Sequence, residues 1–272
     1  LLELPSPVAD GEWATVAAGV SRLEAHELRR RSELLGLPLA VPGERRGRRE
    51  ADVPGDDTAA GVRSRRIRTA PAGVATAELV VADLSALWAG PLVGRLLRAA
   101  GARVMKIESV GRPDGGRAGD PAFFARMNGG KSSVTLAIDR TDGRRRLGEI
   151  VSGADVVITS SRPRALEQLG LDAEAIVRHR RPRVWLMISG YGQTGEWRNR
   201  AAFGDDAAVA GGLIGWHGTT PCFFGDAVAD PFTGLAATVA VLSALESDGA
   251  WTIDASMADV AAGTSIPTPT PH

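Results

Sequence analysis

The sequence of 272 residues has little cysteine, histidine, lysine or tyrosine, and it lacks long apolar runs. Its single cysteine, Cys222, excludes a disulfide framework and a clustered thiolate zinc site within one chain. None of the four histidines has a second histidine or a carboxylate at metal-ligand spacing. No apolar run approaches the length of about 18 residues that a membrane-spanning helix needs. We therefore expect neither a metal site nor a membrane-spanning segment.

An excess of charge of either sign is also missing. Lys+Arg and Asp+Glu are both 32, so the net charge gives no sign of a nucleic-acid partner. The first segment, LLELPSPVADGEW, lacks the basic and apolar regions of a signal peptide. A lone cysteine is compatible with a reducing compartment. Together these features predict a cytoplasmic protein that binds no nucleic acid.

Three common nucleotide and hydrolase motifs are absent. There is no GxSxG, so a serine hydrolase would lack its nucleophile turn. The strand expected at 77–85 leads into SALWAGP instead of GxGxxG, which removes the dinucleotide fingerprint. NGGKSS (128–133) resembles the end of a P-loop, but Ala125 replaces the first glycine and a strand follows Lys131 where a helix is needed. We reject an NTPase, and Lys131 is either a point charge for a phosphate or a solvated turn lysine.

Short apolar runs alternate with amphipathic stretches from residue 77 onward. Such alternation predicts a parallel sheet covered on both faces, because each crossover lays its helix against the sheet. The expected fold class is α/β, with an open Rossmann-like, mostly parallel sheet and helices on both faces. Strands are expected at 77–85, 103–108, 133–139, 155–160, 183–190 and 251–256, and helices at 89–102, 143–154, 164–180, 205–215 and 231–246.

Four regions of the chain differ in composition. Residues 1–41 form an N-terminal helical segment, with a helix expected at 25–35. Residues 42–76 are rich in Arg, Gly and Pro with few apolar anchors, which predicts a linker or long surface loop. A basic arm that binds phosphate is the alternative for this region. Residues 77–264 form the Rossmann-type domain, and 265–272 form a tail.

Six segments follow one another in the order found in one enzyme family. They are VADLSALWAGPLVGRLLRAAGARVMKIE (81–108), NGGKSSVTLAI (128–138), GADVVITSSRPRALEQLGLD (153–172), RVWLMISGYGQTGEW (183–197), GDAVADPFTGLAA (225–237) and WTIDASMADV (251–260). Residues 78–262 thereby resemble the family III CoA-transferases, the group of formyl-CoA and carnitine CoA-transferases and α-methylacyl-CoA racemases. The resemblance implies a Rossmann-like large domain that binds coenzyme A thioesters.

Asp230 lies in ADPFTG (229–234), where two interpretations compete. As part of a helix start, aspartate is a preferred N-cap and Pro231 suits the first helical position. The resemblance instead implies that Asp230 is the catalytic nucleophile. It would move CoA between an acyl-CoA and a small carboxylic acid through an aspartyl anhydride and an aspartyl-CoA thioester. Four small residues are expected to leave room for the thioester: Gly225, Ala227, Ala229 and Gly234.

Coenzyme A needs a pocket for its adenine and cations for its phosphates. The expected pocket residues are Leu87, Trp88, Lys131, Ser160 and Ser161 by resemblance, together with the loop after Glu108, and Arg112 and Arg162 by charge. Each of these arginines is equally well explained as a surface charge. A tryptophan such as Trp88 is more often a core aromatic residue than a platform for adenine.

The segment after GQTG departs from the family pattern. Where racemases carry His-Asp, this sequence reads Phe203-Gly204-Asp205, so the imidazole that racemisation would use is missing. A transferase is therefore favoured over a racemase. Gly204 also departs from the Phe-Asp of many transferases, and Asp205 or Asp206 could substitute for that aspartate.

Family members continue into a smaller domain that has no match in this sequence. ELRRRSELLGLPLAV (27–41) resembles the segment with which they return to the large domain, so a permuted or pared-down domain is one interpretation. We expect the small domain to be missing, and a homodimer or a partner chain to supply it. Two alternatives to the transferase remain: a non-catalytic CoA-binding or subunit-like protein, and an α-methylacyl-CoA racemase-like enzyme.

Overall fold

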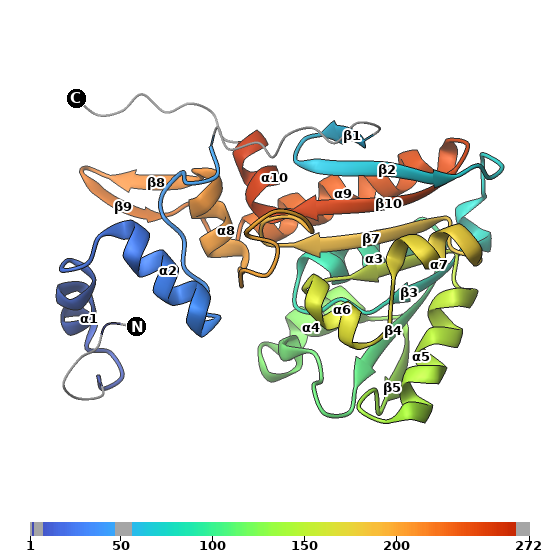
Figure 1. The fold of residues 1–272 in the computed structure, drawn as a ribbon, viewed down its shortest axis with the longest axis horizontal. Coiled ribbons are helices and arrows are strands. Elements are labelled where there is room, and N and C mark those ends of the chain that lie inside the picture. The colour runs from blue at the N-terminus through green and yellow to red at the C-terminus, as the bar shows by residue number, and fades with distance from the viewer. Residues whose placement is uncertain (1, 3–7, 47–55, 265–272) are drawn as a thin grey trace.

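The computed structural model describes residues 2, 8–46 and 56–264. Residues 47–55 of the expected linker and the expected tail at 265–272 lie outside this described part. The expected α/β fold with a mostly parallel sheet is confirmed (Figure 1). No helix in the described part is both long and apolar enough to cross a bilayer.

An eight-stranded sheet and a two-stranded ribbon contain all the described strands. These are β1 (Asp56–Ala59), β2 (Val62–Arg68), β3 (Val80–Asp83), β4 (Arg103–Ser109), β5 (Ser132–Leu136), β6 (Val156–Thr159), β7 (Val184–Ser189), β8 (Ile214–His217), β9 (Thr220–Phe223) and β10 (Ala250–Ser256). The large sheet has the order β1-β2-β10-β7-β6-β3-β4-β5. Its strands from β10 to β5 are parallel, whereas β2 runs antiparallel to both β10 and β1. β6 (VVIT) is buried at every residue, as expected of a strand covered on both faces.

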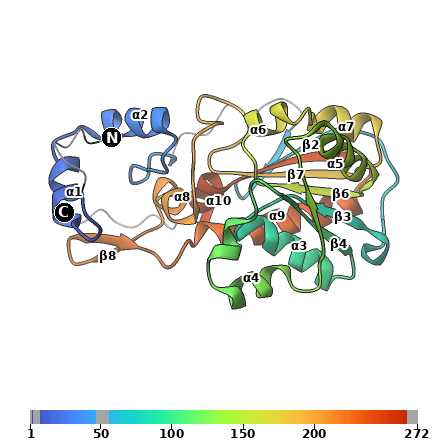
Figure 2. The ribbon, with the colours of Figure 1, turned by 90° about the horizontal axis from the view of Figure 1, so that it is seen from below.

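Helices cover both faces of the large sheet. The helices of the described part are α1 (Trp13–Val20), α2 (Ala25–Leu35), α3 (Ala89–Ala99), α4 (Pro121–Asn128), α5 (Thr141–Gly153), α6 (Pro163–Gln168), α7 (Ala173–His179), α8 (Gly204–Gly211), α9 (Ala229–Glu246) and α10 (Met257–Thr264), with short 3-10 helices η1 (Thr76–Glu78) and η2 (Gly115–Ala118). Figure 2 shows α3 and α9 on one side of the sheet, and α5, α6 and α7 on the other. Each side has its own cluster of buried apolar residues, so the domain has two core layers.

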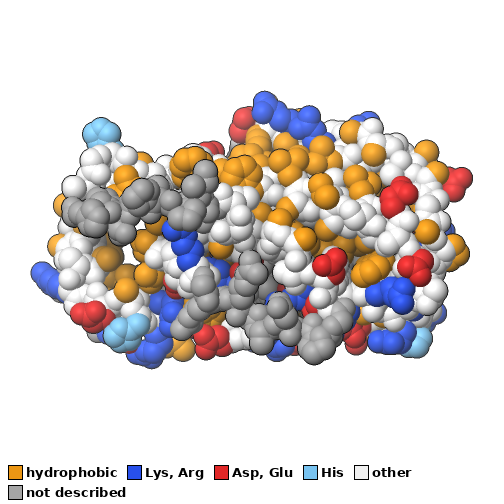
Figure 3. Space-filling model, turned by 90° about the horizontal axis from the view of Figure 1, so that it is seen from above, with side chains coloured by type: hydrophobic (Ala, Val, Ile, Leu, Met, Phe, Trp, Pro, Cys, Tyr) orange, Lys and Arg blue, Asp and Glu red, His pale blue; other side chains and the backbone are white. Residues whose placement is uncertain are grey.

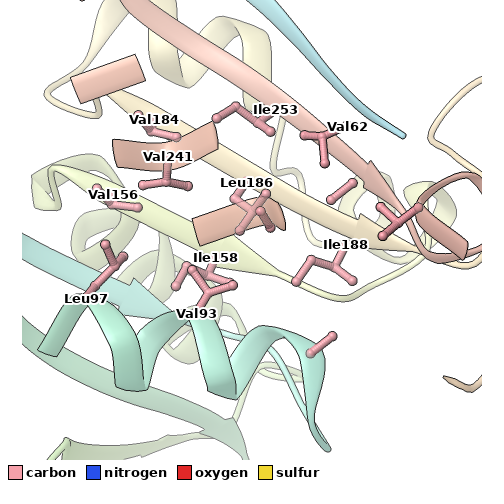
Figure 4. Packing of buried hydrophobic residues seen from close by; sticks show 14 of the residues in the cluster. Val62, Val93, Leu97, Val156, Ile158, Val184, Leu186, Ile188, Val241 and Ile253 are labelled. Carbon is pink, nitrogen blue, oxygen red and sulfur yellow. The ribbon is translucent and has the colours of Figure 1, made fainter. Parts of the chain in front are cut away.

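The larger core lies between the sheet and the α3–α9 pair. Figure 4 shows Val93 and Leu97 of α3 beside Val156 and Ile158 of β6, and all four side chains are fully buried. Burial of each such side chain contributes about 1.5–3 kcal/mol relative to exposure. This packing fixes the start of α3 above the carboxyl end of the sheet.

Helix α9 is apolar on its outer side as well as its inner side. Leu235 and Val239, which are one turn apart, are 52% and 64% exposed. In the view from above, hydrophobic side chains gather over the part of the molecule that contains the large sheet (Figure 3). An all-round apolar helix is more typical of a buried position than of a surface one.

The N-terminal helices lie beside the sheet domain (Figure 1), and ion pairs join the segment that follows them to this domain. The expected helix at 25–35 is confirmed as α2, whereas α1 was not expected. The Arg45 guanidinium donates to both carboxylate oxygens of Asp259 in α10, at 2.5 and 2.9 Å. Arg200 donates to Glu44 at 2.8 Å. Residues near 45 therefore belong structurally to the domain.

Part of the expected linker is a hairpin at the edge of the large sheet, so the prediction of a linker or loop is wrong for residues 56–68. Ala60 and Gly61 join β1 to β2 with φ of 49° and 78°, as in the two-residue turns typical of hairpins. A Cβ on Gly61 would lie 2.3 Å from the backbone nitrogen of Val260, so the close approach of α10 requires glycine. The arginine-rich composition concealed the strand because its side chains form ion pairs near the surface, such as Arg65 with Asp56 at 2.7 Å.

The helix expected at 205–215 is shorter than predicted. It forms α8 and ends at Gly211, since Gly212 takes a left-handed φ of 84° that stops the helix. The following residues form the β8–β9 ribbon, which Figure 1 shows extending away from the large sheet.

The strand order creates a switch point at the carboxyl end of the sheet. β3 leads through α3 to β4 on one side, whereas β6 leads through α6 and α7 to β7 on the other side. In open α/β sheets, ligands bind at the crevice between two such strands. The turns that follow β3 and β6 meet here, where the Ala86 N–H donates to Ser160 Oγ at 3.0 Å.

Two buried ion pairs lie beneath this edge and use the only two lysines of the sequence. Lys106 Nζ lies 2.6 Å from Asp114, and Lys131 Nζ lies 2.8 Å from Asp83. None of these four side chains is more than 2% exposed. Removing charges from water is expensive, so each partner depends on the other.

We predict that Lys131→Met destabilises the protein by about 3–5 kcal/mol, because it leaves the Asp83 carboxylate buried without a cation. Chemical unfolding in urea measures the loss. The double variant Lys131→Met/Asp83→Asn should lose less, since the stranded charge is gone. Arg145→Ala is the control, because the Arg145–Glu149 pair is exposed and should contribute less than about 1 kcal/mol. A Lys131→Met loss as small as that of the control would contradict the prediction.

Candidate active site

The Asp230 side chain reaches from α9 to the start of a second helix. α9 begins at Ala229 with Val228 as its N-cap residue, so the prediction that Asp230 caps this helix is wrong. Asp230 Oδ1 instead accepts a hydrogen bond from the Ala89 N–H, the first residue of α3, at 3.1 Å. The N–H of Gly204, the first residue of α8, also lowers the pKa of this carboxylate. Three helix N-termini therefore converge on one half-buried carboxylate, which favours negative charge there.

The acidity of Asp230 reflects a balance between burial and these donors. Burial raises the pKa of Asp230 from 3.8 to about 6, and the N–H groups of Ala89 and Gly204 oppose the rise. The negative charges of Asp205 and Asp226 raise the pKa further. No lysine or arginine in the described part forms an ion pair with Asp230. Asp230 is therefore mostly ionised at pH 7, yet its charged form is less stabilised than that of an ordinary surface aspartate.

Gly204 is the residue that lets α8 approach Asp230. A Cβ at this position would lie 2.3 Å from Asp230 Oδ2 and 2.4 Å from the Ala227 carbonyl oxygen. Both distances are far shorter than any real carbon–oxygen contact. Glycine replaces the aspartate of the Phe-Asp pattern at position 204. In this chain the replacement has a steric reason, because no larger residue fits there.

The two aspartates after Gly204 hold the surrounding backbone. Asp205 Oδ1 accepts the N–H of Ala227 at 2.7 Å, and Ala227 has a left-handed φ of 45° that is uncommon for a residue with a Cβ. Asp206 Oδ1 accepts the N–H of Phe203 at 2.6 Å and so caps α8. Burial raises the pKa of Asp206 to about 6. Asp205 thus positions the loop before α9, and Asp206 positions the start of α8.

The turn between β3 and α3 presents a run of backbone N–H groups to side chains. The N–H of Ser85 donates to Asp83 at 3.0 Å, and that of Leu87 donates to Asp114 at 2.9 Å. The Ala86 and Ala89 N–H groups bind Ser160 and Asp230, as described above. Four side chains from different parts of the chain thus define this turn. Leu87 and Trp88, both expected at a CoA pocket, lie at its tip.

The other expected pocket residues lie at the same edge of the sheet, with one exception. Ser160 and Arg162 are exposed and Ser161 is half-buried just after β6, while Arg112 is exposed after β4. The half-buried Trp88 packs edge-on against Phe123 of α4, with ring centroids 5.0 Å apart. In the described part, no three His, Cys, Asp or Glu side chains are placed to hold a metal ion.

Lys131 is the exception among the expected phosphate partners. Its side chain is 1% exposed, and its ammonium group donates to Asp83, to the Pro91 carbonyl and to Asn128, at 2.8, 2.9 and 2.9 Å. All three N–H donors are therefore used inside the protein. The structure corrects the expectation of a phosphate contact or a solvated turn, and Lys131 instead supports the frame beneath the site.

Two of the small residues expected to admit a thioester have a packing role. Ala229 is fully buried, and a Cβ on Gly234 would lie 2.8 Å from the Leu92 side chain and 2.9 Å from the Ala89 carbonyl oxygen. Gly234 thus allows α3 and α9 to pack closely. This packing brings the Ala89 N–H within reach of Asp230.

Asp114 is the main site residue that sequence analysis did not identify. It is 4% exposed and contacts Lys106, Leu87 and η2. A signal was available in the sequence, because Lys106 stands in the apolar strand VMKI and a buried lysine needs a carboxylate partner. The identity of that carboxylate could not be read from the sequence, since several acidic residues follow the strand.

Residues 77–270, which contain the whole site, match the family model of CoA-transferase family III. An acyl-CoA transferase from Fusarium pseudograminearum is 34% identical over 184 residues, which are 61% of this chain and 40% of that protein. A succinyl-CoA–L-malate CoA-transferase beta subunit from Chloroflexus aurantiacus is 33% identical over 183 residues, which are 62% of this chain and 44% of that protein.

The fold has a matching counterpart among solved structures. A CaiB/BaiF family protein from Brucella suis superposes with a TM-score of 0.63 at 32% identity, over 69% of this chain and 54% of that one. The chain spans less than half the length of the two curated relatives above. The family match nevertheless covers most of the chain and includes Asp230 and the turn that binds it. The chain belongs to CoA-transferase family III.

Proposed function

We propose that this protein transfers coenzyme A between an acyl-CoA thioester and a carboxylic acid, with Asp230 as the nucleophile. The observation that carries the proposal is the half-buried Asp230 carboxylate, which accepts the Ala89 N–H and has no cationic partner among the residues that the structure describes. Such a carboxylate is ionised at neutral pH, yet no salt bridge has to break before it attacks. Family membership and the names of the relatives support the same chemistry.

The proposed reaction uses Asp230 to form and break acyl bonds. A carboxylate oxygen attacks the thioester carbonyl, the C–S bond breaks, and CoA leaves as a thiolate from a mixed anhydride. The thiolate then attacks Asp230 Cγ and expels the donor acid as a carboxylate, which leaves an aspartyl-CoA thioester. The acceptor carboxylate then attacks Asp230 Cγ and expels the CoA thiolate, which gives a second mixed anhydride. The thiolate attacks the acceptor carbonyl of this anhydride, forms the new acyl-CoA and releases the Asp230 carboxylate. Bound CoA makes each return attack effectively intramolecular.

The N–H groups around Asp230 have a second use in this reaction. When a thiolate or carboxylate attacks Cγ, negative charge develops on the oxygen that the Ala89 N–H already binds. A donor placed there before the reaction stabilises the tetrahedral oxyanion without reorganisation. The backbone at the start of α3 would thus act as the oxyanion hole for attack on Asp230.

We propose that CoA lies along the turns that follow β3, β4 and β6. Leu87 is 39% exposed at the tip of the first turn and could contact the pantetheine or adenine. Arg112 and Arg162 are exposed and are the proposed phosphate partners. Ser160 and Ser161 would add hydrogen bonds at the switch point, next to Trp88.

The relatives suggest which substrates to test first. One is named a succinyl-CoA–L-malate CoA-transferase subunit, so succinyl-CoA and L-malate are the first donor and acceptor to test. This relative is named a beta subunit, which motivates the proposal that a second chain, either a copy or a partner, completes the enzyme. A racemase has less support, because the 52% exposed Phe203 offers no acid or base group.

Asp230→Ala should lower transfer from succinyl-CoA to L-malate by about 10³-fold or more while CoA still binds, because the covalent route is lost. Product formation followed by liquid chromatography, with CoA affinity from calorimetry, separates the two effects. Asp226→Asn is the matched control, since this exposed carboxylate lies near Asp230 but accepts no bond in the proposed chemistry. Retained turnover in Asp230→Ala would refute the assignment.

The pH profile of transfer should show an acid limb near pH 6. Below that pH the Asp230 carboxyl, whose pKa is raised to about 6, is protonated and cannot attack. The value of kcat/KM should then fall about tenfold for each pH unit. Asp226→Asn should move the limb to lower pH, because it removes a negative charge that raises this pKa. An unchanged rate down to about pH 4 would contradict the assignment.

Gly204→Ala should lower kcat by about 10²-fold, because the new methyl group displaces the Asp230 carboxylate or the backbone at Ala227. Gly148→Ala in α5 is the matched control, since a Cβ there meets no atom within 4 Å. The control should keep full transfer and gain a little helix stability. Equal activity of the two variants would show that Gly204 has no steric role at Asp230.

A further inference from the structure

Leu87 adopts a backbone conformation that leucine rarely takes. Its φ is 67°, in the left-handed region, where the Cβ of a non-glycine residue is crowded. Strained residues of this kind persist only where the surrounding structure holds them in place. The turn must reverse sharply at this position, because Ala89 two residues later begins α3 and binds Asp230.

Asp114 is the side chain that holds Leu87. Asp114 Oδ1 accepts the Leu87 N–H at 2.9 Å and also the Gly116 N–H at 2.9 Å. A Cβ on Gly115 would lie 3.3 Å from Leu87 Cδ2, so the absence of a side chain at Gly115 leaves room for Leu87. Asp114 therefore fixes the backbone of Leu87, and Gly115 leaves space for its side chain.

Asp114 is itself held rigidly beneath the turn. Its Oδ2 accepts from Lys106 Nζ at 2.6 Å, and its own N–H donates to Glu108 at 3.0 Å. Glu108 in turn binds the Arg117 guanidinium through two bonds of 2.8 and 2.6 Å. Lys106 also donates to the Ser85 carbonyl. The network thus ties β4 and η2 to the turn that carries Ala89.

We infer that Asp114 is a positioning residue that keeps Leu87 left-handed and thereby aims the Ala89 N–H at the Asp230 carboxylate. The inference rests on the proposed function in that it gives Asp230 a catalytic task. Asp114 contacts neither Asp230 nor, in the proposed reaction, the substrate. Its effect passes through three residues of backbone, from Leu87 to Ala89.

A purely structural role for Asp114 would lead to a different result. As the cap of η2 and the partner of Lys106, Asp114 would affect stability alone. Asp230 would then titrate normally in any variant that still folds. As a positioning residue, Asp114 must change Asp230 itself, because the Ala89 hydrogen bond lowers the pKa of that carboxyl.

The test uses Asp114→Asn, in which the amide oxygen turns to Lys106 and its NH₂ group faces the Leu87 N–H. Carboxyl ¹³C NMR, with the Asp230 signal identified by its absence in Asp230→Asn, follows the titration of Asp230 in the resting protein. We expect the titration midpoint to move to higher pH and kcat for transfer to fall about tenfold, with a smaller change in KM. Adding Leu87→Gly should reverse the NMR shift, since glycine adopts a positive φ without a hydrogen bond.

Leu87→Val tests the same idea without touching the ion pair. A β-branched residue resists a positive φ, so this variant should also move the Asp230 midpoint upward. Asp155→Asn is the matched control. This buried aspartate likewise accepts a backbone N–H, from Val80 at 2.9 Å, and pairs with Arg181, but it lies at the other end of β3. The control should leave the Asp230 titration unchanged.

The two proposals fail in different ways. An Asp230 midpoint that stays in place in folded Asp114→Asn and Leu87→Val would overturn the positioning role, whatever their stability. A shift that Leu87→Gly does not reverse would also overturn it, because the effect would then not pass through Leu87. Transfer retained by Asp230→Ala would overturn the proposed function, and the NMR titration would still decide the positioning role.

Discussion

The hydrogen bond from the Ala89 N–H to Asp230 Oδ1 is the contact on which the rest of the site depends. It joins the first residue of α3 to the first turn of α9, two helices that lie side by side on one face of the sheet. Gly234 permits their close packing, and Gly204 permits the start of α8 to approach the same carboxylate. A single carboxyl group thereby lies at three helix N-termini, whose dipoles favour its negative charge despite burial.

A frame of buried charge lies beneath this contact. Lys131 pairs with Asp83 at the carboxyl end of β3, and Lys106 of the neighbouring β4 pairs with Asp114. Buried ion pairs of this kind rarely contribute net stability over apolar packing, but they impose strict geometry because each partner needs the other. Here they act on a turn that apolar contacts alone could not define, since its N–H groups need specific acceptors.

Sequence reasoning anticipated the fold where it depends on local patterns and failed where a contact depends on residues distant in sequence. The order of strands and helices after residue 77 followed from apolar periodicity, and Asp230 was singled out as a candidate nucleophile from the ADPFTG motif. The hairpin at 56–68 was missed because its arginines lie near the surface, where periodicity is weak. The prediction for Lys131 was wrong because its neighbours in sequence resemble a solvated turn. Its partner Asp83 lies 48 residues away in sequence but only 2.8 Å away in space.

The sequence alone determined the α/β class, the alternation of elements and the family to which this chain belongs, because these depend on patterns along the chain. Only the tertiary structure decided that Asp230 faces Ala89 instead of capping its own helix, and that Asp114 supports the turn between them. The physical reason is that a hydrogen bond is decided by distance and direction between groups that the fold brings together. Ala89 and Asp230 are 141 residues apart, and no local pattern encodes that approach.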